Sequence, residues 1–400
     1  MNKKINKGIA RGTIFAKPSK SYAHLLLIAA YLCNTEIEVK NIILNNDILA
    51  TLNCLKVIGA NINIKDNNAY FTKKAKVKEN IYLDCFESGS TLRFLIPIVI
   101  VLGLKVVFTG TNKLFSRGLS VYEDIFKQDD INYNLNENSL SINGTLKGGK
   151  YYVKGNISSQ FITGLLFALP LLKNDSIIEL TTPLESKNYV DITLDVLNQF
   201  GIDIDVLDNG FFIKGNQQYV GKNSVVEGDY SNASFFQALN YLGGSIVING
   251  LNPYSLQGDS LYLKYFNVIE AGYSKIDISN CIDLGPILFT MAAYFNGAHF
   301  IGTSRLSIKE SDRVNDILVE LEKFGLKYQI LENEVIIEKS ILHKPSVKLH
   351  SHNDHRLVMA LSILLTAFGG IIENVEAVNK SYPDFFEDLL SLGIEVEDCE

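Results

Sequence analysis

The chain concentrates charges of both signs in one short stretch, Lys309-Glu310-Ser311-Asp312-Arg313. Apolar residues then recur at positions 314, 317, 318, 321 and 324, a spacing that predicts an amphipathic helix directly afterwards. Ser311 or Asp312 can cap that helix. A helix N-terminus favours anions because its N–H groups and its dipole both point at them. The stretch therefore predicts either a solvated charged turn or an anion site with a carboxylate beside it.

Other segments place polar or charged residues at the expected start of an apolar helix. They supply Lys20 and Ser21, Gly89 and Arg93, Arg117, Ser158, Ser159 and Gln160, Ser186 and Tyr189, Asp283, His355 and Arg356, and Lys380. Each segment alone fits a helix cap, a solvated cation or a structural hydrogen bond at least as well as a ligand contact.

Taken together, these segments predict a cleft that handles anions. If the helix starts converge, it receives Lys20, Arg93, Arg117, Lys309, Arg313, Arg356 and Lys380. Asp283 and Glu310 are the carboxylates best placed to share that cleft. Such a combination suits proton transfer on a highly anionic small substrate.

The composition excludes several classes of protein. The 400 residues are 47% hydrophobic and 20% charged, with a net charge of −7, which argues against nucleic acid as a partner because no basic stripe is present. Residues 94–104 form the longest apolar run, which is too short to span a membrane, and the polar residues 1–7 lead us to expect no export signal. The five scattered cysteines indicate neither a disulfide framework nor a zinc site. We therefore expect a cytoplasmic protein with reduced thiols.

One pattern recurs six times: an amphipathic helix, a breaker and a short alternating strand. The breakers lie at positions 59, 130, 201, 272, 325 and 393, so that the first four are each 71 residues apart. A near-constant period indicates a repeated supersecondary unit, and a glycine after a helix is a C-cap signal. The pattern predicts six α/β units, plausibly three in each of two domains, which is also the prior for this length.

No long linker separates the two expected domains. The best boundaries are residues 16–19 and 225–228, which predict a first domain of residues 19–227 and a second of residues 1–18 with 228–400. The chain would then cross between the domains twice, and two crossings suggest a hinge that closes on ligands.

The order of these segments and their residues resemble those of the enolpyruvyl transferase family, and within it the enzymes that act on shikimate 3-phosphate. The matching pieces span nearly the whole chain in family order: PSKSYAH (18–24), ESGSTLRFL (87–95), SRGL (116–119), SSQF (158–161), SKNYVDIT (186–193), GDYSNASFF (228–236), DLGPI (283–287), IKESDR (308–313), NDHR (353–356) and NKSYPDFF (379–386). The resemblance implies an α/β (α+β) fold, a two-domain inside-out barrel of six βαβαββ units. It implies an enzyme of aromatic amino acid biosynthesis that joins phosphoenolpyruvate to the 5-hydroxyl of shikimate 3-phosphate and releases phosphate.

The resemblance also assigns roles to residues. Lys20, Ser21, Ser158, Ser159, Gln160, Ser186, Tyr189, Asp283 and Lys309 would bind shikimate 3-phosphate, and Lys20, Gly89, Arg117, Gln160, Arg313, Arg356 and Lys380 would bind phosphoenolpyruvate. Asp283, Glu310 and Lys20 would carry the proton transfers. Neither a metal nor a cofactor is implied, and the family is usually monomeric.

Three positions depart from the family pattern. Leu25 stands where the family has an arginine that contacts the shikimate carboxylate, Gly118 replaces a usual proline, and Ser307 replaces a common basic residue. Losing a charge-assisted hydrogen bond costs roughly 1.5–3 kcal/mol. Leu25 therefore leaves a weakened or non-catalytic binding protein as the first alternative. The sister enzyme that acts on UDP-N-acetylglucosamine is the second, but its reactive cysteine has no counterpart in residues 113–120.

Overall fold

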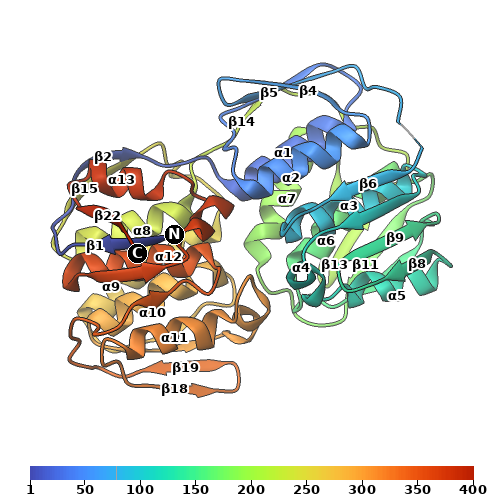
Figure 1. Cartoon of the computed structure of the whole chain (residues 1–400). Helices are drawn as coiled ribbons and strands as arrows, with labels where there is room; N and C mark the ends of the chain where they lie inside the picture. Colours follow the sequence, from blue (N-terminus) through green and yellow to red (C-terminus); the bar gives the residue numbers. More distant parts are fainter. Residues whose placement is uncertain (78) are drawn as a thin grey trace. The chain divides into compact units, whose positions relative to one another are not determined.

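The computed structural model describes residues 1–77 and 79–400. Two compact units make up the chain: residues 18–227 form the inserted unit, and residues 1–17 with 228–400 form the split unit. In Figure 1 the inserted unit runs from blue to yellow-green, while the split unit combines the dark-blue N-terminus with the yellow-to-red C-terminal half. Each unit has its own hydrophobic core.

The inserted unit contains three four-stranded sheets, ordered β14-β3-β5-β4, β6-β7-β9-β8 and β10-β11-β13-β12. Their first two strands are parallel, and a hairpin adds the two antiparallel strands. The strands are β3 (Ile37–Lys40), β4 (Asn61–Lys65), β5 (Asn68–Thr72), β6 (Ile81–Asp84), β7 (Val106–Thr109), β8 (Asn132–Leu135), β9 (Ser139–Asn143), β10 (Lys150–Val153), β11 (Ser176–Leu180), β12 (Ile204–Leu207), β13 (Gly210–Ile213) and β14 (Ser224–Val225).

Two kinds of helix fill the inserted unit. Three are apolar around most of their circumference and almost entirely buried, as expected for helices inside a core: α1 (Lys20–Leu32), α3 (Gly89–Val101) and α6 (Ser159–Ala168). The others are amphipathic or short: α2 (Asn46–Val57), α4 (Asn112–Ser116), α5 (Ser120–Gln128), η1 (Leu169–Leu171) and α7 (Lys187–Gln199). Helix α3 packs on α6, and α1 packs on both α2 and α7.

The split unit repeats this plan with two four-stranded sheets, β16-β17-β19-β18 and β20-β21-β1-β22, and one two-stranded sheet, β15-β2. The strands are β1 (Asn2–Ile5), β2 (Arg11–Phe15), β15 (Ser245–Asn249), β16 (Lys275–Asp277), β17 (Ala298–Ile301), β18 (Tyr328–Leu331), β19 (Glu334–Ile337), β20 (Leu349–His350), β21 (Gly370–Glu373) and β22 (Val396–Cys399). The helices are α8 (Tyr230–Tyr241), η2 (Gly258–Leu261), α9 (Tyr262–Ala271), η3 (Ile282–Leu284), α10 (Gly285–Tyr294), η4 (Ser304–Ile308), α11 (Arg313–Glu322), α12 (His355–Phe368), η5 (Val375–Lys380) and α13 (Phe385–Ser391).

Two strands each pair with a strand of one unit, although the helix that follows them belongs to the other unit. Strand β2 precedes α1 of the inserted unit but pairs in parallel with β15 of the split unit. Strand β14 precedes α8 of the split unit but pairs in parallel with β3 of the inserted unit. The chain therefore passes between the units at residues 17–18 and again at residues 227–228.

One repeat departs from the expected six-fold pattern. In each four-stranded sheet, an antiparallel strand lies beside the second strand. In four of them this strand belongs to a hairpin, and in the sheet of β20, β21, β1 and β22 it is the N-terminal strand β1. After α9, however, the chain goes directly into β16, so the sheet of β2 and β15 has no hairpin. This explains the short interval between the breakers at 272 and 325, which is 53 residues where the earlier intervals are 71.

Among the described residues, no helix is long and apolar enough to cross a membrane.

Candidate active site

Lys20 and Ser21 open helix α1 in the inserted unit. Ser19 caps the helix with its hydroxyl, which accepts from the Tyr22 amide. The Lys20 ammonium lies 2.9 Å from Asp47 Oδ2 in the first turn of α2. This contact fixes a cation at the α1 N-terminus, where the helix dipole already favours an anion. Asp47 was not singled out from the sequence.

A chain of buried hydroxyls supports the adjoining start of α3. The Ser88 hydroxyl caps α3 by accepting from the Thr91 amide at 3.2 Å, and the Thr91 hydroxyl bonds Ser88 Oγ at 2.7 Å. Thr91 also lies 2.7 Å from Thr51 Oγ1, which lies 2.8 Å from His24 Nδ1. Burial lowers the pKa of His24 to about 3, so the imidazole is neutral and the network carries no charge at neutral pH.

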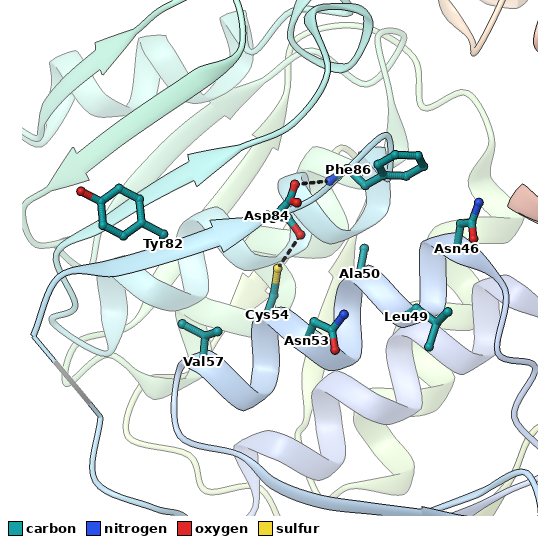
Figure 2. Close-up of a pocket in the computed structure, with 9 residues that line it drawn as sticks. All are labelled: Asn46, Leu49, Ala50, Asn53, Cys54, Val57, Tyr82, Asp84 and Phe86. Carbon is teal, nitrogen blue, oxygen red and sulfur yellow. Dashed lines mark hydrogen bonds between the residues drawn. The ribbon is translucent and has the colours of Figure 1, made fainter.

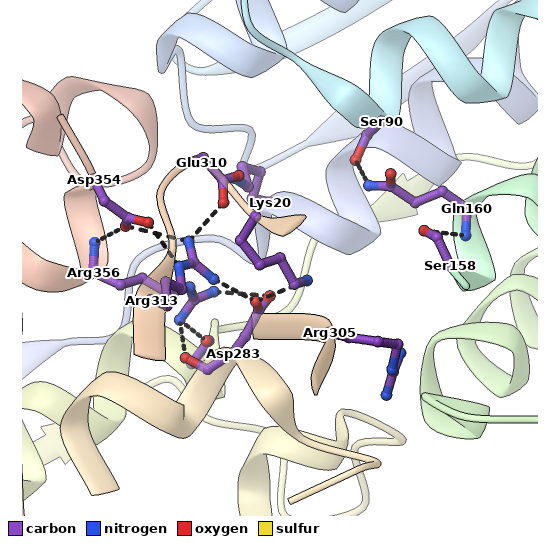
Figure 3. A network of polar contacts seen from close by, with 12 residues as sticks. Lys20, Ser90, Ser158, Gln160, Asp283, Arg305, Glu310, Arg313, Asp354 and Arg356 are labelled. Carbon is purple, nitrogen blue, oxygen red and sulfur yellow. Dashed lines mark hydrogen bonds and ion pairs between the residues drawn. The ribbon is translucent and has the colours of Figure 1, made fainter. Parts of the chain in front are cut away.

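Arg93 links the start of α6 to the loop that carries Arg117. Its Nη1 donates to Gln160 Oε1 at 2.7 Å, and its Nη2 lies 3.3 Å from the carbonyl oxygens of Arg117 and Gly118. The other end of the Gln160 amide donates to Ser90 Oγ at 2.9 Å, as Figure 3 shows. Arg93 thus fixes the orientation of the Gln160 amide and the position of the loop that carries Arg117.

Two glycines fit this arrangement. A Cβ on Gly89 would lie 2.9 Å from Arg117 Nη1, so the missing side chain leaves room for the guanidinium at the start of α3. Gly118 has a φ of 78°, which proline cannot adopt because its ring fixes φ near −65°. The backbone at Gly118 therefore has a conformation that the family's usual proline could not adopt.

The remaining predicted residues of the inserted unit lie at the starts of α6 and α7. Ser158 caps α6 through the Gln160 amide at 3.4 Å, and Ser159 is the first residue of that helix. Ser186 is buried immediately before α7 with φ 54° and ψ 41°, a left-handed conformation that costs a non-glycine residue energy. Tyr189 lies in the first turn of α7, and its carbonyl accepts from Thr193 Oγ1 at 2.8 Å.

Leu25 lies in the core. Only 3% of its surface is exposed, and it packs among the apolar residues of the inserted unit. The position that carries a ligand-binding arginine in the family therefore contributes hydrophobic burial here.

In the split unit, Arg313 is the centre of an ion-pair network, shown in Figure 3. Its Nε lies 2.7 Å from Asp354 Oδ2, its Nη1 lies 2.8 Å from Asp283 Oδ1, and its Nη2 lies 2.8 Å from Glu310 Oε2. The side chain is 1% exposed. Burial acts to lower the pKa of Arg313, but the three carboxylates outweigh it and raise the pKa.

Asp354 is the buried anchor of this network. It caps α12 by accepting from the Arg356 amide at 2.8 Å, and Ser311 Oγ lies 3.3 Å from its second oxygen. Burial acts to raise the pKa of Asp354, but the Arg313 guanidinium outweighs it and holds the pKa below its usual range. No local pattern predicts a role for Asp354, because only the fold brings it to Arg313.

Asp283 contacts three cationic side chains. Besides Arg313, it contacts Lys309 Nζ at 3.2 Å and Arg356 Nη2 at 3.2 Å. The Arg356 Nη1 also donates to the Asp283 carbonyl at 3.0 Å and to Ser231 Oγ. The structure thus brings Asp283, Lys309, Glu310, Arg313 and Arg356 into one cluster.

Lys380 lies at the end of η5 and donates to the Asn353 carbonyl at 2.7 Å. Residues His352 and Asn353 both have positive φ, at 50° and 56°. Such strain persists only where the surrounding contacts hold it, and here it shapes the turn that leads into Asp354 and Arg356.

Asp259 is a further buried acid close to this cluster. Burial, together with the neighbouring Asp283, raises the pKa of Asp259 to about 6, although Arg356 acts in the opposite direction. No sequence motif had pointed to it.

Two cavities of the inserted unit lie apart from these residues. Figure 2 shows one of about 330 Å³ between α2 and β6, whose lining includes Asn46, Asn53, Cys54, Tyr82 and Phe86. None of the predicted site residues lines it. Within residues 1–77 and 79–400, no group of His, Cys, Asp and Glu side chains is arranged to hold a metal ion.

The fold is that of the enolpyruvyl transferases. EPSP synthase from Acinetobacter baumannii matches with a TM-score of 0.80 at 21% identity, over 99% of this chain and 100% of that one. The enolpyruvyl transferase NikO from Streptomyces tendae matches with a TM-score of 0.78 at 13% identity, over 99% and 98%.

The sequence narrows this class to one family. Residues 6–389 match the family EPSP synthase (3-phosphoshikimate 1-carboxyvinyltransferase). The 3-phosphoshikimate 1-carboxyvinyltransferase of Clostridium kluyveri is 42% identical over 427 residues, covering 98% of each chain, and that of Clostridium perfringens is 41% identical over 408 residues, covering 96% of each. The chain belongs to the EPSP synthase family.

Proposed function

We propose that this chain transfers the enolpyruvyl group of phosphoenolpyruvate to the 5-hydroxyl of 3-phosphoshikimate and releases phosphate, a step of aromatic amino acid biosynthesis. Membership of the EPSP synthase family and relatives at about 40% identity support this reaction. The observation that carries it is the buried Arg313 network, which holds two carboxylates, Asp283 and Glu310, beside the cations Lys309 and Arg356.

For 3-phosphoshikimate, we assign the hydroxyl and amide groups of the inserted unit. Phosphate oxygens suit neutral donors at helix starts together with one cation. The residues are Lys20, Ser21, Ser158, Ser159, Gln160, Ser186 and Tyr189, with Asp283 and Lys309 of the split unit.

For phosphoenolpyruvate, we assign mainly cations. Arginine binds carboxylate and phosphate bidentately, and the residues are Arg117, Arg313, Arg356, Lys20 and Lys380, with Gln160 and the glycine backbone at Gly89. Positive charge is needed because the substrate carries both a carboxylate and a phosphate.

The proton transfers follow from the two carboxylates. In the addition step, Glu310 gives a proton to the methylene carbon while the 5-hydroxyl oxygen bonds the adjacent carbon and loses its proton to Asp283. In the elimination step, the C–O bond to phosphate breaks, Lys20 protonates the leaving phosphate, and Glu310 recovers a proton from the methyl group. Asp283 contacts Lys309, Arg313 and Arg356, and Glu310 contacts Arg313, so both carboxylates lie next to positive charge.

Phosphate release with both substrates tests this proposal, with phosphoenolpyruvate alone as the background and Glu310→Gln as the inactive control. Leu25→Arg is assayed alongside, and we expect its KM for 3-phosphoshikimate to fall on the order of 10-fold. Because Leu25 is buried in the core, its unfolding free energy is measured as well.

The outcomes separate the alternatives. Release by the natural chain supports the proposed reaction. Phosphate release by Leu25→Arg but not by the natural chain indicates a site impaired at one contact. No phosphate release by either protein indicates a binding protein. Phosphate release only with UDP-N-acetylglucosamine indicates the sister activity. The domain closure, the monomeric state and the cytoplasmic location remain predictions.

A further inference from the structure

Strand β15 has an edge at which the described residues supply no strand. In the other five sheets an antiparallel strand occupies this place, and within the described residues nothing but the side chain of Asn240 is hydrogen-bonded there. The alignment with the Clostridium kluyveri relative extends over 427 residues, more than the 400 of this chain. It therefore includes positions that this chain lacks.

The outward-facing groups of β15 can be identified from its contacts. The Ser245 amide donates to the Ala10 carbonyl at 2.9 Å, and the Asn249 carbonyl accepts from the Ala16 amide at 2.8 Å, so residues 245, 247 and 249 face β2. Main-chain groups alternate along a strand. Those of Ile246 and Ile248 therefore point away from β2.

The Asn240 amide closes half of this edge. Its Oδ1 accepts from the Ile246 amide at 2.6 Å and its Nδ2 donates to the Ile246 carbonyl at 3.0 Å. These are the two bonds that a neighbouring strand would make. Asn240 lies in the last turn of α8, so the helix that precedes β15 also protects its edge.

The strand itself carries none of the usual protection against pairing. Natural edges are guarded by charged residues, prolines or bulges, but Ser245-Ile246-Val247-Ile248-Asn249 contains neither charge nor proline. Its pattern is also nearly symmetric about Val247, which is 58% exposed. A two-fold axis at Val247 would place Ile246 opposite Ile248 of a second copy, with the polar ends facing each other.

We propose that the outer edge of β15 is a latent pairing surface for a second copy of this chain, and that the Asn240 side chain keeps it closed. Antiparallel pairing across the two-fold would give the order β2-β15-β15-β2, four strands as in the other sheets. Such an isologous contact closes on itself. The Arg11 amide on the far side of β2 already bonds the Leu392 carbonyl at 2.9 Å, so growth beyond a dimer is hindered.

Light scattering after size-exclusion chromatography, over a range of concentrations, tests this proposal on the full chain. We expect the natural chain to be monomeric and Asn240→Ala to dimerise, with a dissociation constant at least about tenfold lower. Asn296→Ala is the matched control, because Asn296 likewise donates to a main-chain carbonyl, that of Glu270 at 3.0 Å, away from the β15 edge. This control is expected to stay monomeric.

Two further variants keep the test decisive. Asn240→Ala with Val247→Lys places like charges opposite each other across the two-fold and should restore the monomer. Asn240→Asp puts a carboxylate at the edge and should stay monomeric. A dimer in the natural chain, a folded monomeric Asn240→Ala, or dimerisation that survives Val247→Lys would each overturn the proposal.

Hydrogen exchange provides a readout that does not depend on the Asn240 variants folding well. In the natural chain, the Ile246 amide should exchange slowly and the Ile248 amide rapidly. Equal protection of both amides in the natural chain would contradict the assigned edge. In the Asn240→Ala dimer, both amides should be protected.

Discussion

In the split unit, the candidate site residues are held by charge: Arg313 contacts Asp354, Asp283 and Glu310, and each of these ion pairs is at least partly buried. In the inserted unit, the equivalent task falls to neutral groups, as Gln160 is fixed between Arg93 and Ser90 and the α3 cap rests on a chain of hydroxyls. The inserted unit also contains the ion pair between Lys20 and Asp47.

This difference affects rigidity and tolerance to change. Removing one partner of a buried ion pair leaves an uncompensated charge, whereas a lost neutral hydrogen bond costs much less. We therefore expect a change at Arg313 to lower both the stability of the split unit and the activity. The inserted unit should lose ligand affinity stepwise.

Arg313→Met should have the largest effect. It leaves Asp354, Asp283 and Glu310 without their shared cation, so we expect the unfolding free energy to fall by about 3–5 kcal/mol and activity to be lost. Urea denaturation measures the first effect and phosphate release the second. The matched variant Lys20→Met removes a single ion pair whose side chains are 17% and 12% exposed, and it should cost less than Arg313→Met because only one carboxylate loses its partner. Equal losses in the two variants would break the comparison.

Glu310→Gln should separate catalysis from stability. The amide keeps the shape and can still accept from Arg313, but it cannot deliver a proton, so we expect kcat to fall about 10²–10⁴-fold. Glu387→Gln, on the exposed first turn of α13, should change neither kcat nor KM. A Glu310→Gln enzyme with normal kcat would rule out the proposed proton transfer.

Arg93→Lys should act on binding. Lysine cannot reach Gln160 and the two loop carbonyls together, so we expect the KM for phosphoenolpyruvate to rise on the order of 10-fold with little change in kcat. Arg11→Lys, on an exposed position of β2, provides the control. A change confined to kcat would show that Arg93 does more than position Gln160 and Arg117.

Two histidines should give the units opposite responses to pH. The folded-state pKa of His24 is lowered to about 3 by burial, so the unfolded chain takes up its proton first and stability falls below pH 6.5. The loss at pH 5.5 should be about 1.4 kcal/mol, and His24→Gln should remove it.

The second histidine works in the other direction. The hydrogen bond to Glu320 raises the pKa of His352, although burial opposes it, and Asp316 adds to the rise. Its contribution is therefore present below the ordinary pKa and is lost as pH rises through the raised value. Urea denaturation of His352→Gln between pH 6 and 9 should show a flatter profile than the natural chain, and an unchanged slope would contradict this assignment.

Much of the fold was predictable because it follows from local pattern. Apolar periodicity located the amphipathic helices, and the breakers after them revealed the repeat before any contact was known. Helix α9 ends at Ala271, directly before the breaker expected at position 272. The sequence also contains the short interval of 53 residues between the breakers at 272 and 325. Its cause, a missing hairpin, becomes clear only when the sheets of the structure are compared.

The candidate site was predictable in its residue types but not in its contacts. The sequence marked Arg313, Asp283 and Glu310, but Asp354 joins them from 41 positions away. It marked Arg93 as one cation among several, whereas its contact with Gln160 spans 67 positions. Such pairs depend on how helix starts meet in three dimensions, and no local spacing encodes that. The ligand assignments themselves remain untested predictions.

The placement of the first strands has a consequence for synthesis on the ribosome. Strand β1 pairs with β22, with Asn2 opposite Cys399, and β2 pairs with β15. The residues of the inserted unit, which ends at Glu227, are therefore all made while β1 and β2 still lack their partners. Since domains generally fold as units during synthesis and distant pairings form slowly, the beginning of this chain is expected to be among the last parts to reach its final place.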